Sequence, residues 1–391
     1  MRIAISGAGI AGPAVAYWLH RTGHVPTVIE QSPSLRTGGY VVDFWGIGYR
    51  IAELMGIERA VLDAGYQVET LRGMRSGGGV MATVDVGAFA EAVDGRYTTI
   101  ARSDLSAILF ATIADDVEVN FGDSITAIDD RPDGVRVNFE HHPDRDFDLV
   151  LGADGLHSRV RQLAFGDRDP EYYMGCVVAA FTADGYRPLE ELSFVLYNTV
   201  GAQAARFALR GDRTLFLFIF RAPPQQIPHS AEAAKAMLRH RFADAGWECR
   251  RILERLDDTD DLYFDAVSQI RLDRWSQGRV ALLGDAAAAV SLLAGEGTGL
   301  AMLEAYVLAG ELQRAGGDHR LALRAYEHRL RTFVSNKQTG ARKFISVFAA
   351  ETRWALHVRN VAMRALGVRT LAKLVSARSF RDDFELPDYR M

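Results

Sequence analysis

The sequence predicts an α/β fold, in which a β-rich insertion interrupts a Rossmann-type domain and long helices close the chain. Three observations predict it. A glycine-rich turn follows a short apolar strand at the start, and strand-like apolar runs typical of parallel sheets return near residues 148 and 279. Between those runs lie many β-type segments, and beyond residue 297 the pattern is helical. The expected domains are 1–71, 98–170 and 271–316 for the Rossmann-type domain, 72–97 and 171–270 for the β-rich substrate-binding domain, and 317–391 for the C-terminal helical segment.

Composition and charge exclude several classes of protein. The formal net charge of -5 argues against a nucleic-acid partner, which would favour a basic excess. Cys176 and Cys249, the only cysteines, lie far apart, which excludes a disulfide scaffold and fits a reducing cytoplasm. Asp285 and Glu296 interrupt the apolar stretch 280–302, so we expect no integral membrane segment. A soluble cytoplasmic protein follows as an expectation, either monomer or homodimer.

The first forty residues read as one βαβ unit, with strands at 2–6 and 25–30 and a helix from about 13 to 22. Gly7 permits the tight turn, Gly9 lets the backbone approach a pyrophosphate, and Gly12 lets the helix pack closely on the strand. The helix N-terminus offers free N–H groups to phosphates. Ile10 and Ala11 complete this candidate nucleotide-binding loop.

A carboxylate ends the second strand of this unit. Glu30 lies 18 residues after Gly12, where an acidic side chain can bond both ribose hydroxyls of a dinucleotide, and Gln31 follows it. The acid argues against a 2′-phosphate at this position. The pattern alone leaves FAD and NAD both open.

Two later strands also end in aspartate. The strand 148–151 delivers Asp154-Gly155, and Asp154 is read either as a ligand or as a turn residue and helix cap. The strand 279–283 delivers Gly284-Asp285, where the carboxylate can accept hydrogen bonds from a sugar-like chain. A helix beginning near Gly297 would favour negative charge on a flat ring beside it, with Gly295 and Thr298 flanking its start.

The remaining elements are expected from periodicity. They are helices at 47–64, 103–114 and 230–245, strands at 117–120, 125–128 and 135–140, and an antiparallel sheet with one face packed that includes 176–181, 192–197 and 215–220.

The three glycine and aspartate motifs, in this order and at these separations, resemble the class A flavoprotein monooxygenases typified by para-hydroxybenzoate hydroxylase. The chain length and the closing residues 386–389 look most like the short tailoring and tetracycline-inactivating branches. The resemblance covers essentially the whole chain and implies a glutathione-reductase-type flavoprotein fold. It implies non-covalent FAD, held by the Gly7 to Gly12 loop, Glu30 and Asp285.

The resemblance also assigns roles to single residues. Arg102 would contact the FAD pyrophosphate or ribityl chain, and Asp154 would serve both FAD and a transient NAD(P)H. Gly39 and its neighbours would lie beside the isoalloxazine, with Arg36 just before them. A solvated surface charge is the alternative reading of both arginines.

The implied reaction uses NADH or NADPH to reduce the flavin, which then reacts with O2 to give a C4a-hydroperoxide. Its distal oxygen passes to an aromatic, polycyclic or polyketide-like small molecule. Phe216 and Phe218 are candidate substrate-wall residues, although strand alternation directs half of such side chains away. No general base and no metal-binding motif is identified.

Two residues depart from the family pattern. Ala288 stands where the family usually has histidine, and Leu292 stands where it has a proline facing the reactive edge of the flavin. These departures keep open a flavin-binding protein without turnover. A flavoprotein dehydrogenase or reductase without oxygen insertion is a separate alternative on the same fold.

Overall fold

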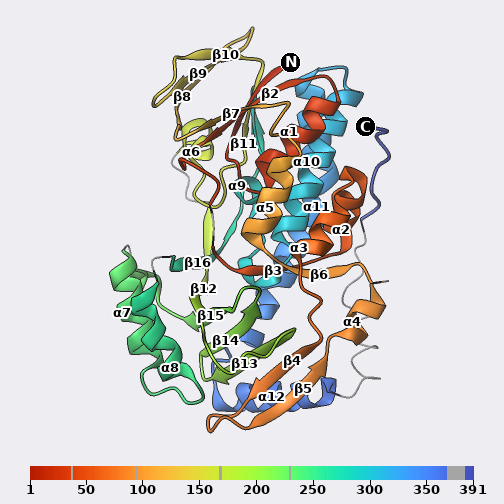
Figure 1. Cartoon of the computed structure of the whole chain (residues 1–391). Helices are drawn as coiled ribbons and strands as arrows, with labels where there is room; N and C mark the ends of the chain where they lie inside the picture. The colour runs from red at the N-terminus through yellow and green to blue at the C-terminus, as the bar shows by residue number, and fades with distance from the viewer. Residues whose placement is uncertain (37, 94, 167–169, 229, 260, 368–383) are drawn as a thin grey trace.

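Two lobes make up the molecule, and the chain passes between them several times (Figure 1). The computed structural model describes residues 1–36, 38–93, 95–166, 170–228, 230–259, 261–367 and 384–391. One lobe contains both termini and a parallel sheet with its helices. The other contains the largest sheet, flanked by α7, α8 and α12.

The first lobe is built on a six-stranded sheet in the order β17-β18-β11-β1-β2-β7. Its pairs are parallel except β17 with β18. The strands are β1 (Arg2–Ser6), β2 (Val25–Glu30), β7 (Glu118–Phe121), β11 (Leu149–Gly152), β17 (Ser276–Gln277) and β18 (Val280–Leu282). The expected return of parallel strands near residues 148 and 279 is confirmed.

Helices cover this sheet because its strands are apolar on both faces. The helices of this lobe are α1 (Ala11–Arg21), α2 (Gly46–Met55), α3 (Glu58–Ala64), α5 (Arg102–Ala111), α6 (Arg159–Phe165), α9 (Asp285–Ala288) and α10 (Gly297–Arg314). The single helix predicted over 47–64 is wrong. Gly56 adopts the left-handed conformation (φ +71°) and ends α2, so a second helix begins after it.

Two small sheets complete the first lobe and its junction. A three-stranded antiparallel sheet consists of β8 (Ile125–Asp130), β9 (Val135–Phe139) and β10 (Arg145–Phe147). The pair β3 (Val41–Trp45) and β6 (Tyr97–Ala101) runs between the lobes (Figure 1).

The second lobe is a seven-stranded sheet in the order β16-β12-β15-β14-β13-β4-β5. Its strands are β4 (Thr70–Met74), β5 (Val80–Asp85), β12 (Glu171–Asp184), β13 (Ser193–Thr199), β14 (Ala202–Leu209), β15 (Arg213–Arg221) and β16 (Tyr263–Ile270). It is mixed and not purely antiparallel as predicted, because β4 enters from the first lobe and runs parallel to β13. A short helix, α4 (Gly87–Ala92), follows β5.

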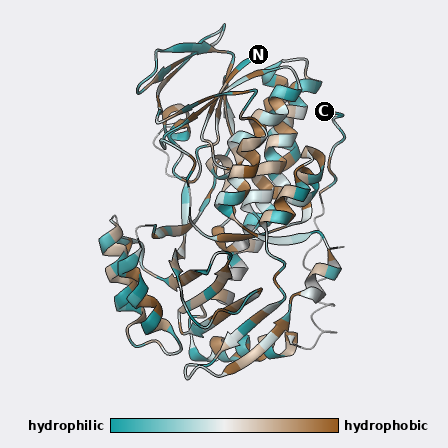
Figure 2. Cartoon of the chain, viewed as in Figure 1, coloured by the Kyte–Doolittle hydropathy of each residue, from teal (hydrophilic) through white to brown (hydrophobic). Residues whose placement is uncertain are grey.

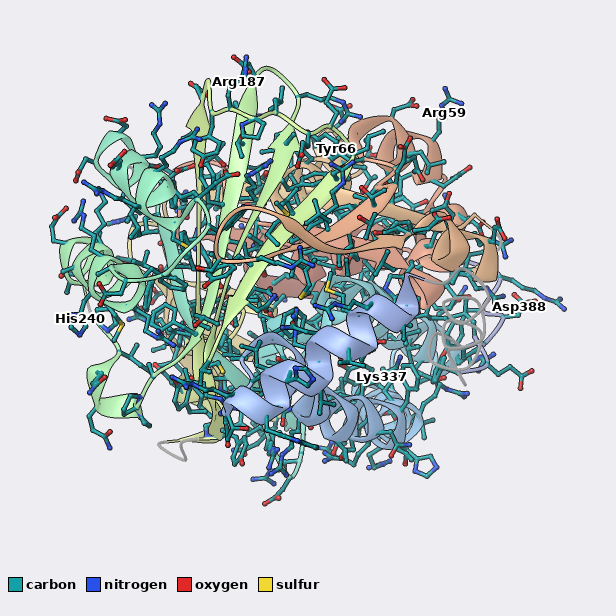
Figure 3. All side chains as sticks on the ribbon, turned by 90° about the horizontal axis from the view of Figure 1, so that it is seen from below. Arg59, Tyr66, Arg187, His240, Lys337 and Asp388 are labelled. Carbon is teal, nitrogen blue, oxygen red and sulfur yellow. The ribbon has the colours of Figure 1, made fainter. Side chains whose placement is uncertain are left out.

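Both faces of this sheet are covered, where one packed face was predicted. The outer face packs on α7 (Ala231–Phe242) and α8 (Cys249–Leu253) through a cluster that contains Phe216 and Phe218. The opposite face, called the inward face below, carries Phe194, Leu196 and Leu217 and contacts β3 and the C-terminal helices. Seen from below, α7 with His240 and α11 with Lys337 lie on different sides of the strands (Figure 3).

The outer-face cluster contradicts the expectation that Phe216 and Phe218 form a substrate wall. Both side chains are completely buried, and Phe218 packs edge-to-face on Phe242 of α7 with ring centroids 4.8 Å apart. Alternation along β15 directs them away from the first lobe and turns Leu217 towards it.

The C-terminal segment is helical, as predicted, over α11 (His319–Phe348) and α12 (Arg353–Leu366), while the part of it at 368–383 lies outside the described residues. Residues 384–391 return to the first lobe, where Tyr389 is buried and donates to Glu311 Oε1 at 2.6 Å. Apolar segments concentrate inside the sheets and polar ones on exposed helix faces (Figure 2). Within the described residues, no helix combines the length and apolarity that crossing a membrane requires.

Phe218→Ala should lower the free energy of unfolding by about 3–5 kcal/mol, because it leaves a cavity among packed aromatic rings. Denaturant unfolding of the apoprotein measures this loss. Val80→Ala, at a side chain that is 49% exposed, is the matched control and should change stability little. A Phe218→Ala protein of unchanged stability would contradict the burial described here.

Candidate functional site

The glycine loop between β1 and α1 lies open towards Arg102. Gly7 has φ +105°, and a Cβ built on Gly12 would lie 1.8 Å from the carbonyl oxygen of Gly7, so only glycine allows this turn against the helix. A Cβ on Gly9 would meet only the Arg102 guanidinium, at 3.7 Å. The backbone at Gly9 therefore faces the Arg102 guanidinium, and no other heavy atom lies within 4 Å of a Cβ built there. Ile10 and Ala11 are buried beneath the loop.

Glu30 is bonded to this loop. Its carboxylate accepts hydrogen bonds from the backbone N–H groups of Ala8 (2.8 Å) and Ser32 (2.9 Å). A carboxylate offers about four acceptor positions, so capacity remains for ribose hydroxyls. Gln31 and Arg36 are exposed beside it, and Arg36 Nε donates to Ser32 Oγ at 3.0 Å.

Arg102 is positioned by the strand pair between the lobes. It begins α5, and its backbone N–H donates to the carbonyl oxygen of Tyr40 at 3.0 Å. Gly39 precedes Tyr40 with φ +97°, and a Cβ there would meet no atom within 4 Å. The backbone at Gly39 thus faces open space next to Arg102.

Asp285 lies on the other side of the same space. Its side chain is exposed to solvent, yet the surrounding protein raises the pKa of its carboxyl by desolvation, which the positive charge of Arg102 opposes. An accessible group that is nevertheless desolvated is typical of a deep cleft. A Cβ on Gly297, at the start of α10, would lie 3.9 Å from Asp285 Oδ1, so the helix begins next to this carboxylate.

The N-terminus of α10 contains a polar atom that needs a partner. Thr298 is 8% exposed, and its hydroxyl finds no hydrogen-bond partner among the described residues. Gly295, with φ +69°, turns the chain just before the helix. A buried hydroxyl without a partner, free helix N–H groups and an adjacent open cleft fit a bound polar ring such as a flavin.

Glu304 supports this arrangement from below, and sequence reasoning missed it. Its carboxylate accepts the backbone N–H of Gly284 at 2.5 Å and lies within 3.4 Å of the Tyr326 hydroxyl. Burial raises the pKa of Glu304 to about 8. Gly284 has φ 62° and ψ -144°, which only glycine adopts readily, so Glu304 holds the turn that presents Asp285. The signal that could have identified Glu304 in the sequence is an acidic residue within the apolar stretch 297–312.

The carboxylate of Asp154 accepts hydrogen bonds from neighbouring protein groups. One carboxylate oxygen accepts from Ser158 Oγ at 2.5 Å, and the other accepts from Val160 N at 3.0 Å and Ser6 Oγ at 3.4 Å. Desolvation raises the pKa of this carboxyl in spite of these bonds. These contacts agree with the interpretation of Asp154 as a turn residue and helix cap. They hold in place the segment that packs on Gly7.

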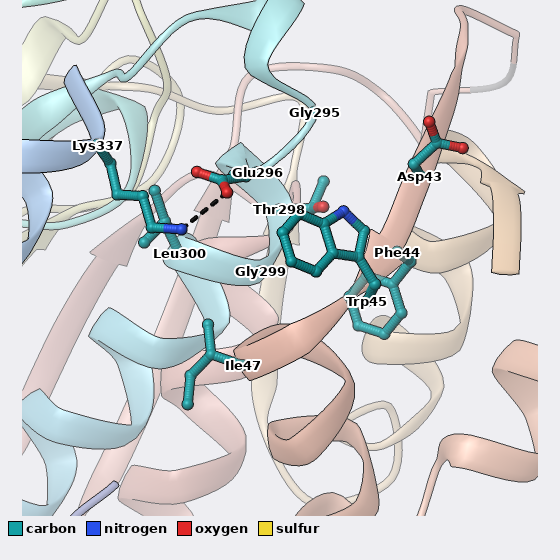
Figure 4. Close-up of a pocket in the computed structure, with 10 residues that line it drawn as sticks. All are labelled: Asp43, Phe44, Trp45, Ile47, Gly295, Glu296, Thr298, Gly299, Leu300 and Lys337. Carbon is teal, nitrogen blue, oxygen red and sulfur yellow. Dashed lines mark hydrogen bonds and ion pairs between the residues drawn. The ribbon is translucent and has the colours of Figure 1, made fainter. Parts of the chain in front are cut away.

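A small pocket opens where β3 meets the start of α10 (Figure 4). Asp43 and Trp45 line one side of it, and Glu296 and Thr298 line the other. Lys337 of α11 closes the pocket by an ion pair with Glu296 at 2.8 Å. The described residues contain no group of histidine, cysteine and acidic side chains that could hold a metal ion.

Comparison with known proteins identifies the family and the cofactor of this chain. Residues 1–339 match a family described as an FAD binding domain. The chain belongs to this family of FAD-binding proteins. A flavin-dependent monooxygenase of an unknown prokaryotic organism is 34% identical over 393 residues, which cover 100% of this chain and 99% of the relative. One from Legionella longbeachae is 36% identical over 345 residues, covering 86% and 87%.

The solved structure of the tetracycline destructase Tet(51) superposes with a TM-score of 0.83 at 31% identity and covers 99% of both chains. The protein is an FAD-dependent monooxygenase that uses NAD(P)H and O2, so the predicted family, fold class, enzyme class and cofactor are confirmed. The dehydrogenase and non-catalytic readings are set aside.

Gly9→Ala should lower FAD affinity by at least about tenfold, or about 1.4 kcal/mol, by narrowing the space below Arg102. The stability of the apoprotein should stay unchanged, because the new Cβ makes only an ordinary contact. Flavin titration and thermal unfolding measure both. Gly77→Ala, where a Cβ meets nothing within 4 Å, is the control. Full flavin retention in Gly9→Ala would place the pyrophosphate elsewhere.

We expect Glu304 to lower the free energy of unfolding of the apoprotein as the pH rises. Its pKa is raised on folding from 4.5 to about 8, so the folded state binds the proton more tightly and loses stability across that interval. Glu304→Gln keeps an acceptor for Gly284 N–H but cannot titrate. The free energy of unfolding, measured across this pH range, should decline less in the variant than in the original protein. An identical decline in both proteins would show that Glu304 does not cause it.

Proposed function

We propose that the enzyme oxygenates a flat, largely apolar aromatic or polyketide-like compound, held between the flavin cleft and the inward face of the seven-stranded sheet. The observation that carries this proposal is the composition of that face where it approaches β3. Leu217, Phe194 and Tyr263 are partly buried there and pack with Tyr40 and Val41 of the first lobe. Apolar surfaces with few polar groups are typical of sites for such ligands.

Two phenols supply the polar groups. The rings of Tyr40 and Tyr263 lie 5.2 Å apart, and both hydroxyls experience the charges of Arg102 and Asp285. Desolvation raises the pKa of Tyr40 to about 12 and raises that of Tyr263 further. Both phenols therefore stay protonated at neutral pH. Tyr40 can donate a hydrogen bond to an oxygen atom of a substrate, whereas the Tyr263 hydroxyl donates to Asp265 Oδ2 at 3.4 Å.

When bound, FAD supplies the redox chemistry and oxygen activation that protein side chains lack. We assign its phosphates to the Gly9 loop and Arg102, its adenosine ribose to Glu30, its ribityl chain to Asp285, and its ring to the space beside Gly39, Gly297 and Thr298. The N-terminus of α10 would favour negative charge on the ring. Leu292 and Leu293 pack with Met174 and Ile345 and would exclude water on that side.

The tetracycline destructases Tet(51) and Tet(55) support the substrate class, because their solved structures match this chain at 31% and 30% identity over nearly its whole length. Their name states that they act on tetracyclines, which are flat and polycyclic. Tetracyclines and other polycyclic phenols are therefore the first compounds to test.

The test is consumption of NADH and NADPH in air by the FAD-loaded enzyme, with a panel of polycyclic and single-ring aromatic compounds, followed by product analysis under ¹⁸O₂. One ¹⁸O atom in the product of a polycyclic substrate supports the proposal. Turnover restricted to single-ring acids would contradict the substrate class. Nicotinamide oxidation without labelled product from any compound would contradict the proposed site of oxygen transfer.

Leu217→Trp should raise the KM for the substrate by about tenfold, because the larger side chain fills the space in front of the inward face. FAD content should be unchanged, since Leu217 lies outside the flavin cleft. Leu163→Trp on the surface of α6, where the leucine is 39% exposed, is the matched control. Steady-state kinetics measure this KM. An unchanged value would show that the substrate does not bind at the inward face.

A further inference from the structure

A second cavity, of about 600 Å³, opens away from the flavin cleft, where the start of β12 and the end of β15 meet α11. None of its lining residues belongs to the set that we assign to FAD. The lining residues used below are Tyr172, Met174, Arg221, Arg342, Ile345 and Glu351.

Arginine side chains give this cavity its charge. Arg342 Nη2 donates to the Tyr172 hydroxyl at 3.4 Å, and its guanidinium lies 5.4 Å from the centre of that ring. Arg271, which is not part of the cavity lining, lies 3.9 Å from the centre of the same ring. Arg221 Nε donates to the Ala349 carbonyl at 2.9 Å. The Arg221 guanidinium is thus oriented before any ligand arrives, which reduces the entropy lost on binding.

One carboxylate opposes them. Glu351 pairs with Arg221 at 2.9 Å, but its side chain is 66% exposed, so the pair is screened by solvent and contributes little. Gly175, with φ +83°, lies in an irregular stretch of β12, and a Cβ there would come within 3.7 Å of Arg221. The missing side chain keeps the guanidinium accessible.

The cavity therefore suits a ligand that combines anionic groups with a flat apolar part. Guanidinium groups bind phosphates through paired hydrogen bonds. Tyr172, Met174 and Ile345 offer apolar surface, and the volume falls within the range of small-molecule sites. An adenosine phosphate has both properties.

One apolar cluster links the lining of this cavity to the chain segment that follows Asp285. Met174 and Ile345 line the cavity and pack in one cluster with Leu292 and Leu293, which follow Asp285 in the chain. Tyr263 packs against the same cluster and experiences the charges of Asp285 and Arg102. Leu292 is only partly buried, so a ligand held at Arg221 and Arg342 could extend along the exposed edge of this cluster towards the flavin.

We propose that this cavity docks the phosphate-bearing adenosine end of NAD(P)H, with the nicotinamide end directed towards Leu292. The sequence holds a single glycine fingerprint, and our assignment gives that one to FAD, so the reductant needs another site. This inference rests on the proposed placement of FAD.

The test measures ADP binding to the FAD-loaded enzyme and, separately, the KM for NADPH and NADH. Arg221→Gln and Arg342→Gln should each weaken ADP binding and raise the KM for the reductant by about tenfold, with kcat and FAD content nearly unchanged. Glu351→Gln should do the opposite and tighten ADP binding, because it removes a negative charge that would repel the phosphates beside Arg221. A gain of affinity cannot come from a damaged fold. Arg353→Gln, an exposed arginine at the start of α12, is the matched control.

The outcomes separate the two proposals. Larger effects with NADPH than with NADH would assign the arginines to the 2′-phosphate, and equal effects would assign them to the pyrophosphate; both support docking. Unchanged ADP binding together with an unchanged KM for both NADPH and NADH in all three cavity variants would overturn it, as would a change confined to the KM of the organic substrate. ADP binding requires no turnover, so failure of the proposed oxygenation would leave this result readable.

Discussion

The architecture of the first lobe depends on close backbone contact at the carboxyl edge of the six-stranded sheet. A Cβ at Gly12 would lie 1.8 Å from the Gly7 carbonyl oxygen, one at Gly7 would lie 2.6 Å from the Ala153 carbonyl oxygen, and one at Gly284 would lie 3.1 Å from Ala11. Four chain segments therefore meet at distances that side chains would prevent. The cleft exists because they leave one side free, between Arg102 and Asp285.

Charge is distributed unevenly around that cleft. Arg102 provides a cation, Asp285 and Glu30 provide carboxylates, and Glu304 lies buried below with its pKa raised. Because desolvation also raises the pKa of Asp285, the protein maintains this carboxylate at a cost that a bound, hydrogen-bonding cofactor would offset. In the proposed arrangement, FAD binding and folding stability are coupled through Asp285.

The sequence predicted the framework of this lobe well, because glycine spacing and strand-end acids are local patterns with a direct physical meaning. It placed the turn at Gly7 to Gly12 and the strand before Asp285. It could not predict which way β15 faces, since alternate side chains of that strand are almost all large and apolar, and so Phe216 and Phe218 were assigned to the wrong face. Gly56 was overlooked because the apolar pattern continues on both sides of it. The supporting role of Glu304 depends on a contact between residues twenty positions apart, which periodicity does not encode.

The order of strands has a consequence for how such proteins can change over time. Strands β4 and β5, from residues 70–85, complete a sheet whose other members lie at 171–270, while β18, at 280–282, pairs with β11 at 149–152. Neither lobe is a continuous segment of the chain. Exchanging one continuous segment therefore cannot transfer the second lobe from one relative to another. New substrate preference must therefore arise by substitution within shared strands, or by two coordinated exchanges. Folding likewise has to wait for the later segments, because the early hairpin gains its neighbour in the sheet only after β13 has been made.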